Sequence, residues 1–215
     1  MDFPPLTGIV LAGGASSRLG TDKALLRLWG ADGPTLLEAT VAKLLSLCHE
    51  VIVVADRPRG RPRLRARTVL DAFPQGGVLG AIYTGLMASH TFHAFVVACD
   101  MPFLNDALLR YMAAQVRDYD VLIPRLPLRP ETAHGNPERV EPLHAIYSRA
   151  CLEPIRQALS AGEQRIVSFF PQVRVRYLEA DEWAHFDPEG LSFRNLNTPE
   201  DLAYAQALLQ HREPI

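Results

Sequence analysis

The chain has 215 residues, of which 48% are hydrophobic and 21% charged, and its formal net charge is −2. This size and composition are typical of one globular domain, and the small net charge argues against a nucleic-acid-binding protein. The three cysteines stand far apart without CxxC spacing, which predicts a reducing compartment rather than a disulfide framework. The sequence has no signal-peptide pattern and no apolar run that is long enough for a membrane span, so we expect a soluble cytoplasmic protein.

The first two thirds of the chain alternate between two kinds of pattern. Short runs rich in valine and isoleucine predict strands that are covered on both faces, and apolar residues three and four apart predict the helices between them. This alternation is typical of a predominantly parallel sheet with helices on both faces. The expected strands are 8–12, 51–55, 68–70, 94–99 and 121–124, and the expected helices are 35–47, 79–90 and 104–118, the last with Asn105 as its N-cap.

The last third is less regular, and a proline-rich stretch at 125–142 predicts a loop. After it we expect a strand at 144–148, helices near 150–160 and 164–170, a strand at 173–179 and a final helix from Pro199. The loop is too short to divide the chain into two domains. We therefore expect one domain, residues 1–215, with a nucleotide-binding half of about 1–120 and an acceptor-binding half of about 121–215.

The stretch LAGGASSRLGTDKALL, residues 11–26, follows the first expected strand. Gly13 and Gly14 allow a tight turn whose bare N–H groups suit phosphate oxygens. Arg18 and Lys23 add a bidentate donor and a mobile point charge for the same phosphates. The alternative is an ordinary strand-to-helix turn with surface arginine and lysine side chains, and the close spacing of the charged residues favours phosphate binding.

Two aspartates, Asp71 and Asp100, follow expected strands and belong to the same rim as the glycine-rich stretch, because ligands of such sheets bind beyond the carboxyl ends of the strands. Asp100, in ACDMPF, suits Mg²⁺, which prefers one or two carboxylates together with waters and substrate phosphates. The alternative for Asp100 is a cap for the following helix.

The stretch LAGGASSRLGTDKAL resembles the LAGGxSxRMGxDKAL signature of nucleotidyltransferases, and most of all that of the molybdenum cofactor guanylyltransferases, the MobA family. The resemblance implies a Rossmann-like three-layer fold of the nucleotide-diphospho-sugar transferase type. It also implies a Mg²⁺-dependent enzyme that joins GMP from GTP to the terminal phosphate of the molybdopterin cofactor. The catalytic residues it implies are Arg18, Lys23 and Asp100, with Asp100 as the metal ligand. The cofactor- and nucleotide-binding residues it implies are Leu11, Ala12, Gly13, Gly14, Lys23, Asp71, Gly80, Asp100, Asn195 and Asn197.

Some of these assignments leave alternatives open. NLNTPED near the C-terminus is similar to the family's N-x-N-TPED ending, which places Asn195 and Asn197 at the rim, although both are also typical turn residues. Gly76, Gly77 and Gly80 lie in GGVLGA, where the family usually has GPLAG-like text. These glycines either let the backbone approach the base or only shape a turn. The family often has an asparagine near Val54, and the neighbouring Asp56 is a candidate substitute.

Other features fit more than one role. His144, in PLHAIY, either contacts the acceptor or packs in the core. The stretch from Arg57 to Arg67 holds six arginines and predicts a solvated loop or a patch for an anionic partner, such as a protein that delivers the cofactor or a molybdoenzyme. The rival functions are a nucleotidyltransferase that uses CTP or another phosphorylated acceptor, and a nucleotide-binding regulator that no longer catalyses.

Overall fold

The computed structural model describes residues 3–13, 22–57, 64–127 and 139–210. In this part of the chain, seven strands form one sheet in the order β3-β2-β1-β4-β6-β5-β7. All neighbours pair in parallel except at β6, which is antiparallel to both β4 and β5. The strands are β1 (Leu6–Leu11), β2 (Glu50–Ala55), β3 (Arg67–Leu70), β4 (His93–Ala98), β5 (Val121–Pro124), β6 (His144–Ser148) and β7 (Val175–Leu178).

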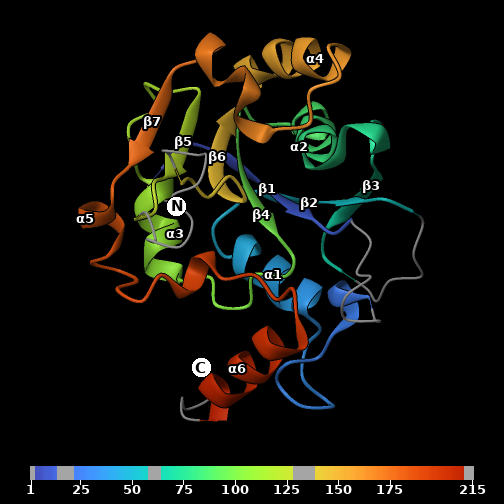
Figure 1. The fold of residues 1–215 in the computed structure, drawn as a ribbon, viewed down its shortest axis with the longest axis vertical. Coiled ribbons are helices and arrows are strands. Elements are labelled where there is room, and N and C mark those ends of the chain that lie inside the picture. The colour runs from blue at the N-terminus through green and yellow to red at the C-terminus, as the bar shows by residue number, and fades with distance from the viewer. Residues whose placement is uncertain (1–2, 14–21, 58–63, 128–138, 211–215) are drawn as a thin grey trace.

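Helices cover both faces of the sheet. Helices α2 and α4 lie above it in Figure 1 and α1 and α3 below it, which makes the three layers expected from the sequence. Helix α6 extends beyond the layers and packs beside the start of α1. The helices are α1 (Leu36–Leu45), α2 (Gly77–Ala88), α3 (Asp106–Ala113), α4 (Leu152–Ser160), α5 (Ala180–Trp183) and α6 (Pro199–Gln210), with 3₁₀ turns η1 (Lys23–Leu25), η2 (Pro74–Gly76), η4 (Arg149–Cys151), η5 (Ile166–Gln172) and η6 (Leu191–Phe193).

The inner strand β1 shows why these segments become strands buried on both faces. All six of its residues are buried, and successive side chains point to opposite faces of a strand. Val10 packs in the cluster that contains the inner residues of α1 and α3, whereas Ile9 and Leu11 pack in the cluster of α2 and α4. A strand with a helical layer on each side needs apolar residues at every position, which is why the runs are continuous.

The expected elements are confirmed, with differences in detail. Asn105 caps α3, accepting a hydrogen bond from the Leu108 amide at 3.0 Å, but the helix ends at Ala113, before the expected 118. The expected helix at 164–170 is instead the 3₁₀ turn η5, which carries Pro171, a residue that has no N–H for a helical hydrogen bond. Of the expected loop 125–142, residues 128–138 lie outside the described part of the chain.

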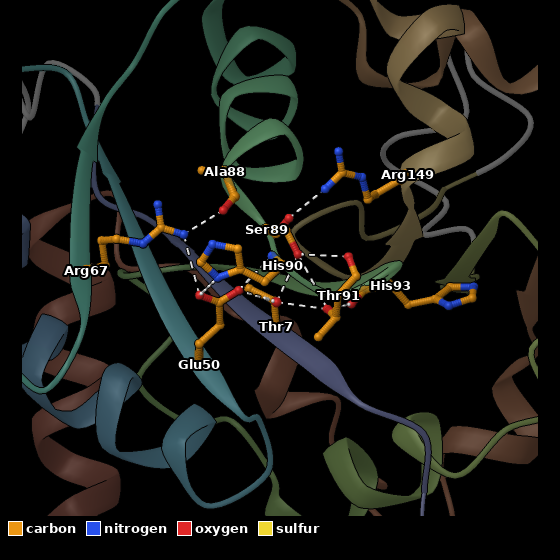
Figure 2. A network of polar contacts seen from close by, with 9 residues as sticks. All are labelled: Thr7, Glu50, Arg67, Ala88, Ser89, His90, Thr91, His93 and Arg149. Atoms are coloured by element: carbon orange, nitrogen blue, oxygen red, sulfur yellow. Dashed lines mark hydrogen bonds and ion pairs between the residues drawn. The ribbon is translucent and has the colours of Figure 1, made fainter.

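All the described strands except β6 run the same way, so the sheet has one end where these strands begin and one where they finish. We call these two ends the amino edge and the carboxyl edge of the sheet. At the edge where these strands begin, polar side chains bond to one another in a closed network (Figure 2). At the edge where they end lies the cavity described below. None of the described helices combines the length and apolar character that a membrane crossing requires.

Candidate active site

A cavity of about 460 Å³ opens at the carboxyl ends of the parallel strands. Its wall combines the ends of β1, β2, β3 and β4 with the first turn of α2 and the segment before α6. That is the place where α/β sheets bind ligands, and the volume falls within the roughly 300–1,000 Å³ of small-molecule sites. The lining residues are Leu11, Ala12, Gly13, Asp22, Lys23, Ala24, Val54, Ala55, Asp56, Asp71, Pro74, Gly77, Val78, Ala81, Ala98, Cys99, Asp100, Leu143, Asn195 and Asn197.

The end of β1 forms the floor on one side. The Ala12 amide donates to the Val54 carbonyl at 2.9 Å, which continues the sheet pairing by one residue beyond the strand. Gly13 then passes close to Asp56, since a Cβ on Gly13 would lie 3.4 Å from both the backbone nitrogen and the Cβ of Asp56. Gly14 and Arg18, the other predicted phosphate-binding residues, lie outside the described part of the chain.

Lys23 enters the cavity from the short turn η1. Asp22 begins this turn and accepts a hydrogen bond from the Ala24 amide at 3.2 Å, so the backbone that carries Lys23 is anchored. The Lys23 Nζ atom lies 2.9 Å from Asp100 Oδ2 and 2.8 Å from Asn197 Oδ1. Three predicted site residues from distant parts of the sequence therefore meet at one point.

Asp100 reaches that point because β4 ends just before it. The Cys99 amide bonds to the Leu11 carbonyl at 3.0 Å, and the Asp100 carbonyl accepts from the Leu196 amide at 2.9 Å. The end of β4 is thus tied both to the end of β1 and to the segment before α6. The carboxylate of Asp100 faces the cavity from this rigid position.

The two predicted asparagines both line the cavity from that segment. Asn197 is held by Asp201, whose Oδ2 accepts from the amides of Asn197 and Thr198, each at 3.0 Å. The Thr198 hydroxyl in turn accepts from the Asp201 amide at 3.1 Å, which completes a cap for α6. The Asn195 Oδ1 atom is buried and has no hydrogen-bond partner among the described residues, which leaves it available to a ligand.

Asp71 and Gly80 have different surroundings from each other. Asp71 lines the cavity, and its Oδ1 accepts hydrogen bonds from the Phe73 amide and the Thr84 hydroxyl, each at 2.9 Å. Gly80, predicted to contact the nucleotide, is buried and is not among the lining residues. A Cβ on Gly80 would lie 2.3 Å from the Phe73 carbonyl oxygen. The absence of a side chain at Gly80 therefore allows α2 to pack closely against the backbone at Phe73. Of the two roles open from the sequence, this placement supports the one in which Gly80 only shapes the local backbone.

The first turn of α2 contributes Val78 and Ala81 to the cavity wall, and neither was predicted from the sequence. Their spacing of three is that of one helix face, and they follow the glycine pair that begins the helix, a signal that the sequence does contain. Gly77 has a φ of +58°, in the region that favours glycine, so the chain turns sharply here and directs the helix N-terminus toward the cavity. Such an N-terminus attracts anions.

His144 does not line the cavity. Its ring is fully buried and lies edge-on to Phe95 and Phe193, with centroids 5.4 and 5.2 Å away. Burial lowers the pKa of His144 to about 4, so the ring is neutral at physiological pH. Of the two roles open from the sequence, the structure supports the packed histidine. Leu143, one residue earlier, contacts the cavity instead.

Known proteins match this chain over nearly its whole length. The model of the MobA-like NTP transferase domain matches residues 8–176. A probable molybdenum cofactor guanylyltransferase of Chloroflexus aggregans is 42% identical over 209 residues, which cover 95% of each chain. The chain belongs to the MobA-like NTP transferase family.

Solved structures of related proteins show the same fold. The molybdopterin-guanine dinucleotide biosynthesis protein A of Archaeoglobus fulgidus superposes with a TM-score of 0.78 at 25% identity, covering 96% of this chain and all of that one. The 2-C-methyl-D-erythritol 4-phosphate cytidylyltransferase of Thermus thermophilus superposes with a TM-score of 0.69 at 21% identity, covering 96% and 100%. The same fold therefore occurs in proteins named for different nucleotides, and the fold alone does not select the base.

Two acidic residues, Glu141 and Asp56, lie near the cavity of this MobA-like domain. Glu141 lies behind the wall at Leu143, where its Oε1 accepts from the Leu143 amide at 3.2 Å. The pKa of Glu141 is raised to about 7, mainly by burial and also by the negative charge of Asp100, which together outweigh the lowering effects of the Leu143 amide and Arg139. Asp56, the candidate substitute for the family's asparagine, does line the cavity, at the end of β2.

The arginine-rich stretch is described only at its two ends. Arg67, at the start of β3, donates to Glu50 at 3.4 Å and to the Ala88 carbonyl at 2.5 Å, so this arginine joins β3 to β2 and α2. Residues 58–63 lie outside the described part of the chain, and the anionic-partner hypothesis stays a prediction.

Proposed function

We propose that this protein is a molybdenum cofactor guanylyltransferase, which transfers GMP from GTP to the terminal phosphate of molybdopterin and releases pyrophosphate. The name of its 42%-identical relative supports the choice of substrates. The observation that carries the proposal is the meeting of Lys23, Asp100 and Asn197 within one cavity at the carboxyl edge of the sheet. That cavity combines a cationic side chain, a carboxylate and a helix N-terminus, the groups that phosphoryl chemistry requires.

The triphosphate would bind across the ends of β1 and β4. The bare backbone at Gly13 allows close approach, the N-terminus of α2 attracts negative charge, and Lys23 provides a full positive charge for the phosphates. The apolar side chains of Val78 and Ala81, on the same wall, suit the flat face of a base. We assign the acceptor to the side of Leu143, Asn195 and Asn197.

The cavity also suits a magnesium ion. Asp100 would hold it, with the side-chain oxygens of Asn195 and Asn197 as further donors, and the unpartnered Asn195 Oδ1 supports this set. Among the described residues, no three of the His, Cys, Asp and Glu type are grouped to form a metal cage, which agrees with the preference of Mg²⁺ for few protein ligands. When bound, Mg²⁺ supplies charge that neutralises and orients the phosphate oxygens.

The reaction needs positioning more than proton transfer. An oxygen of the acceptor's terminal phosphate forms a bond to the α-phosphorus of GTP, and the bond from that phosphorus to the β-phosphate oxygen breaks. Pyrophosphate leaves with the electron pair of the broken bond. The attacking oxygen is already anionic, so a general base is not required, and the chain's task is to align the two substrates and to neutralise their charge with Lys23 and Arg18.

The direct test is pyrophosphate release when the protein is mixed with molybdopterin, Mg²⁺ and each of the four nucleoside triphosphates. We expect release with GTP, dependence on both Mg²⁺ and acceptor, and its loss in Asp100→Asn. Faster release with CTP would contradict the assignment of guanine. Tight GTP binding without any release would instead indicate a regulator that does not catalyse.

A further inference from the structure

Lys23 contacts oxygen atoms that would bind a metal ion in this cavity. Its ammonium group donates to Asp100 Oδ2 at 2.9 Å and to Asn197 Oδ1 at 2.8 Å. These are oxygen atoms of two of the three side chains that suit Mg²⁺ in this cavity. The ammonium group takes up one lone pair of each oxygen and places a positive charge beside any cation that binds there, so the lysine and a metal compete for these oxygens.

The contact is fixed by the backbone on every side. Asp22 caps the turn that carries Lys23, and the Asp100 carbonyl is bonded to the Leu196 amide. Asp201 holds the backbone at Asn197. The side chains of Lys23 and Asp100 are only 19% and 17% exposed, so water screens their attraction less than at an open surface. The pair is therefore a built feature of the site rather than a chance surface contact.

We propose that Lys23 serves as the resident cation of the nucleotide-free site, so that a divalent metal binds weakly by itself and loads together with the triphosphate. The inference rests on the proposed function, because it takes the triphosphate as the ligand that draws Lys23 away. The phosphates offer Lys23 a new anionic partner, and its departure frees Asp100 and Asn197 for the metal. Metal and nucleotide then assist each other's binding, and this coupling acts equally in both directions.

Binding of Mn²⁺ alone, measured by calorimetry or by the spin-resonance signal of the free ion without nucleotide, tests this competition. Lys23→Met removes the ammonium group and keeps a side chain of similar length. We expect this variant to bind Mn²⁺ at least about tenfold more tightly than the wild type, and Lys23→Gln to behave in the same way. Adding Asp100→Asn to Lys23→Met should abolish the gain, which assigns the bound ion to this site.

The matched control is Lys43→Met. Lys43 lies on α1 and is also paired, with Asp106 Oδ1 at 2.8 Å, so its loss changes the net charge by the same unit away from the cavity. We expect its Mn²⁺ affinity to stay within about twofold of the wild type. Equal affinity in the wild type and both folded Lys23 variants would overturn the proposal, as would an equal gain in Lys43→Met. If either result were obtained while the wild type transfers GMP, the inference would fail and the proposed function would stand. A wild type that binds no nucleotide with the metal would refute the proposed function itself.

Discussion

The two edges of the sheet use polar residues in opposite ways. At the edge where the parallel strands begin, Glu50 accepts hydrogen bonds from the Thr7 hydroxyl at 2.9 Å and from the His90 amide at 2.8 Å (Figure 2). Thr7 also bonds to Thr91 and Ser89, so these groups satisfy one another. At the edge where the strands end, Asp100 and Asn197 instead share the ammonium group of Lys23 in a cavity.

We interpret this difference as one between groups that stabilise the fold and groups that bind the proposed ligand. Burial raises the pKa of Glu50, but the hydrogen bonds from His90 and Thr7 outweigh it and hold that pKa below the usual value, which is typical of a carboxylate engaged within the fold. At the other edge, Asn195 lines the cavity, and its buried Oδ1 atom has no partner among the described residues. We therefore expect substitutions at the first edge to change stability and substitutions at the second to change activity.

The largest expected effect is on catalysis. Lys23→Ala and Asp100→Ala should each lower kcat several-hundred-fold, about 3–4 kcal/mol of transition-state stabilisation, because each removes a charge that neutralises phosphate or holds the metal. The melting temperatures of both should stay near that of the wild type. The rate of pyrophosphate release measures kcat, and circular dichroism measures the melting temperature. Near-normal turnover in either variant, with the fold intact, would contradict the assignment of this edge as the active site.

A second prediction concerns the pH dependence of stability near the cavity. Below pH 6.5 a histidine in the unfolded chain binds a proton, whereas folded His144, with a pKa of about 4, stays neutral. The contribution of His144 to the free energy of unfolding therefore falls as the pH falls from 6.5 toward 4. Glu141 acts in the opposite direction. An unfolded glutamate ionises near 4.5, whereas folded Glu141 keeps its proton up to about pH 7, so its contribution falls as the pH rises between those values.

Between pH 5 and 6.5 the two groups oppose each other, and single substitutions should reveal each one. Relative to the wild type, the free energy of unfolding of His144→Leu should fall by up to about 2 kcal/mol over this interval, and that of Glu141→Gln should rise by a similar amount. Urea denaturation at the two pH values measures both changes. Slopes parallel to the wild type in both variants would mean that neither group is perturbed as described.

A third prediction tests the opposite edge. Glu50→Ala leaves the Thr7 hydroxyl and the His90 amide without their acceptor, and we expect a loss of about 2 kcal/mol in the free energy of unfolding. The turnover number should not change, because the network lies at the far edge from the cavity. Glu50→Gln is the matched control, which keeps the shape and one carbonyl oxygen and should cost less. A kcat lowered as far as in Asp100→Ala would break the distinction between the edges.

The smallest expected effect is at Asp201, which belongs to the fold and also positions the site. Asp201→Ala removes the acceptor for the Asn197 and Thr198 amides and should destabilise the protein by about 1 kcal/mol, as loss of a helix cap does. Because Asn197 then loses its anchor, we also expect a several-fold lower kcat. Glu200→Ala, at the exposed neighbouring position in the same helical turn, should change neither quantity. A kcat of Asp201→Ala equal to that of Glu200→Ala would remove Asp201 from the support of the site.

The carboxyl edge could be predicted well from the sequence because its strands have a clear pattern. A run such as residues 51–55 is apolar at every position, and the polar residue after it must emerge at the rim. The same logic placed Asp71 and Asp100 on the same rim as the glycine-rich stretch, and all three line the cavity. The antiparallel direction of β6 was less evident, although no helical pattern separates it from β5, and neighbours joined without a crossover helix pair in antiparallel fashion.

Other features depend on contacts between distant segments, which spacing does not encode. The clash that a side chain at Gly80 would make with Phe73 appears only once α2 is packed. The burial of His144 between Phe95 and Phe193 joins three separate parts of the sequence. The contact of Lys23 with Asn197 spans 174 positions. Local pattern therefore predicted which residues reach the rim but not which of them touch.

The most direct test of the central claim is nucleotide binding measured by thermal shift, since a ligand that binds only the folded state raises the melting temperature. GTP, CTP, ATP and UTP would each be added with Mg²⁺ to the wild type and to Lys23→Met. We predict that GTP raises the melting temperature of the wild type most, and that this rise is largely lost in the variant. An equal rise in both proteins, or no rise with any nucleotide, would show that the triphosphate does not bind between Lys23 and Asp100.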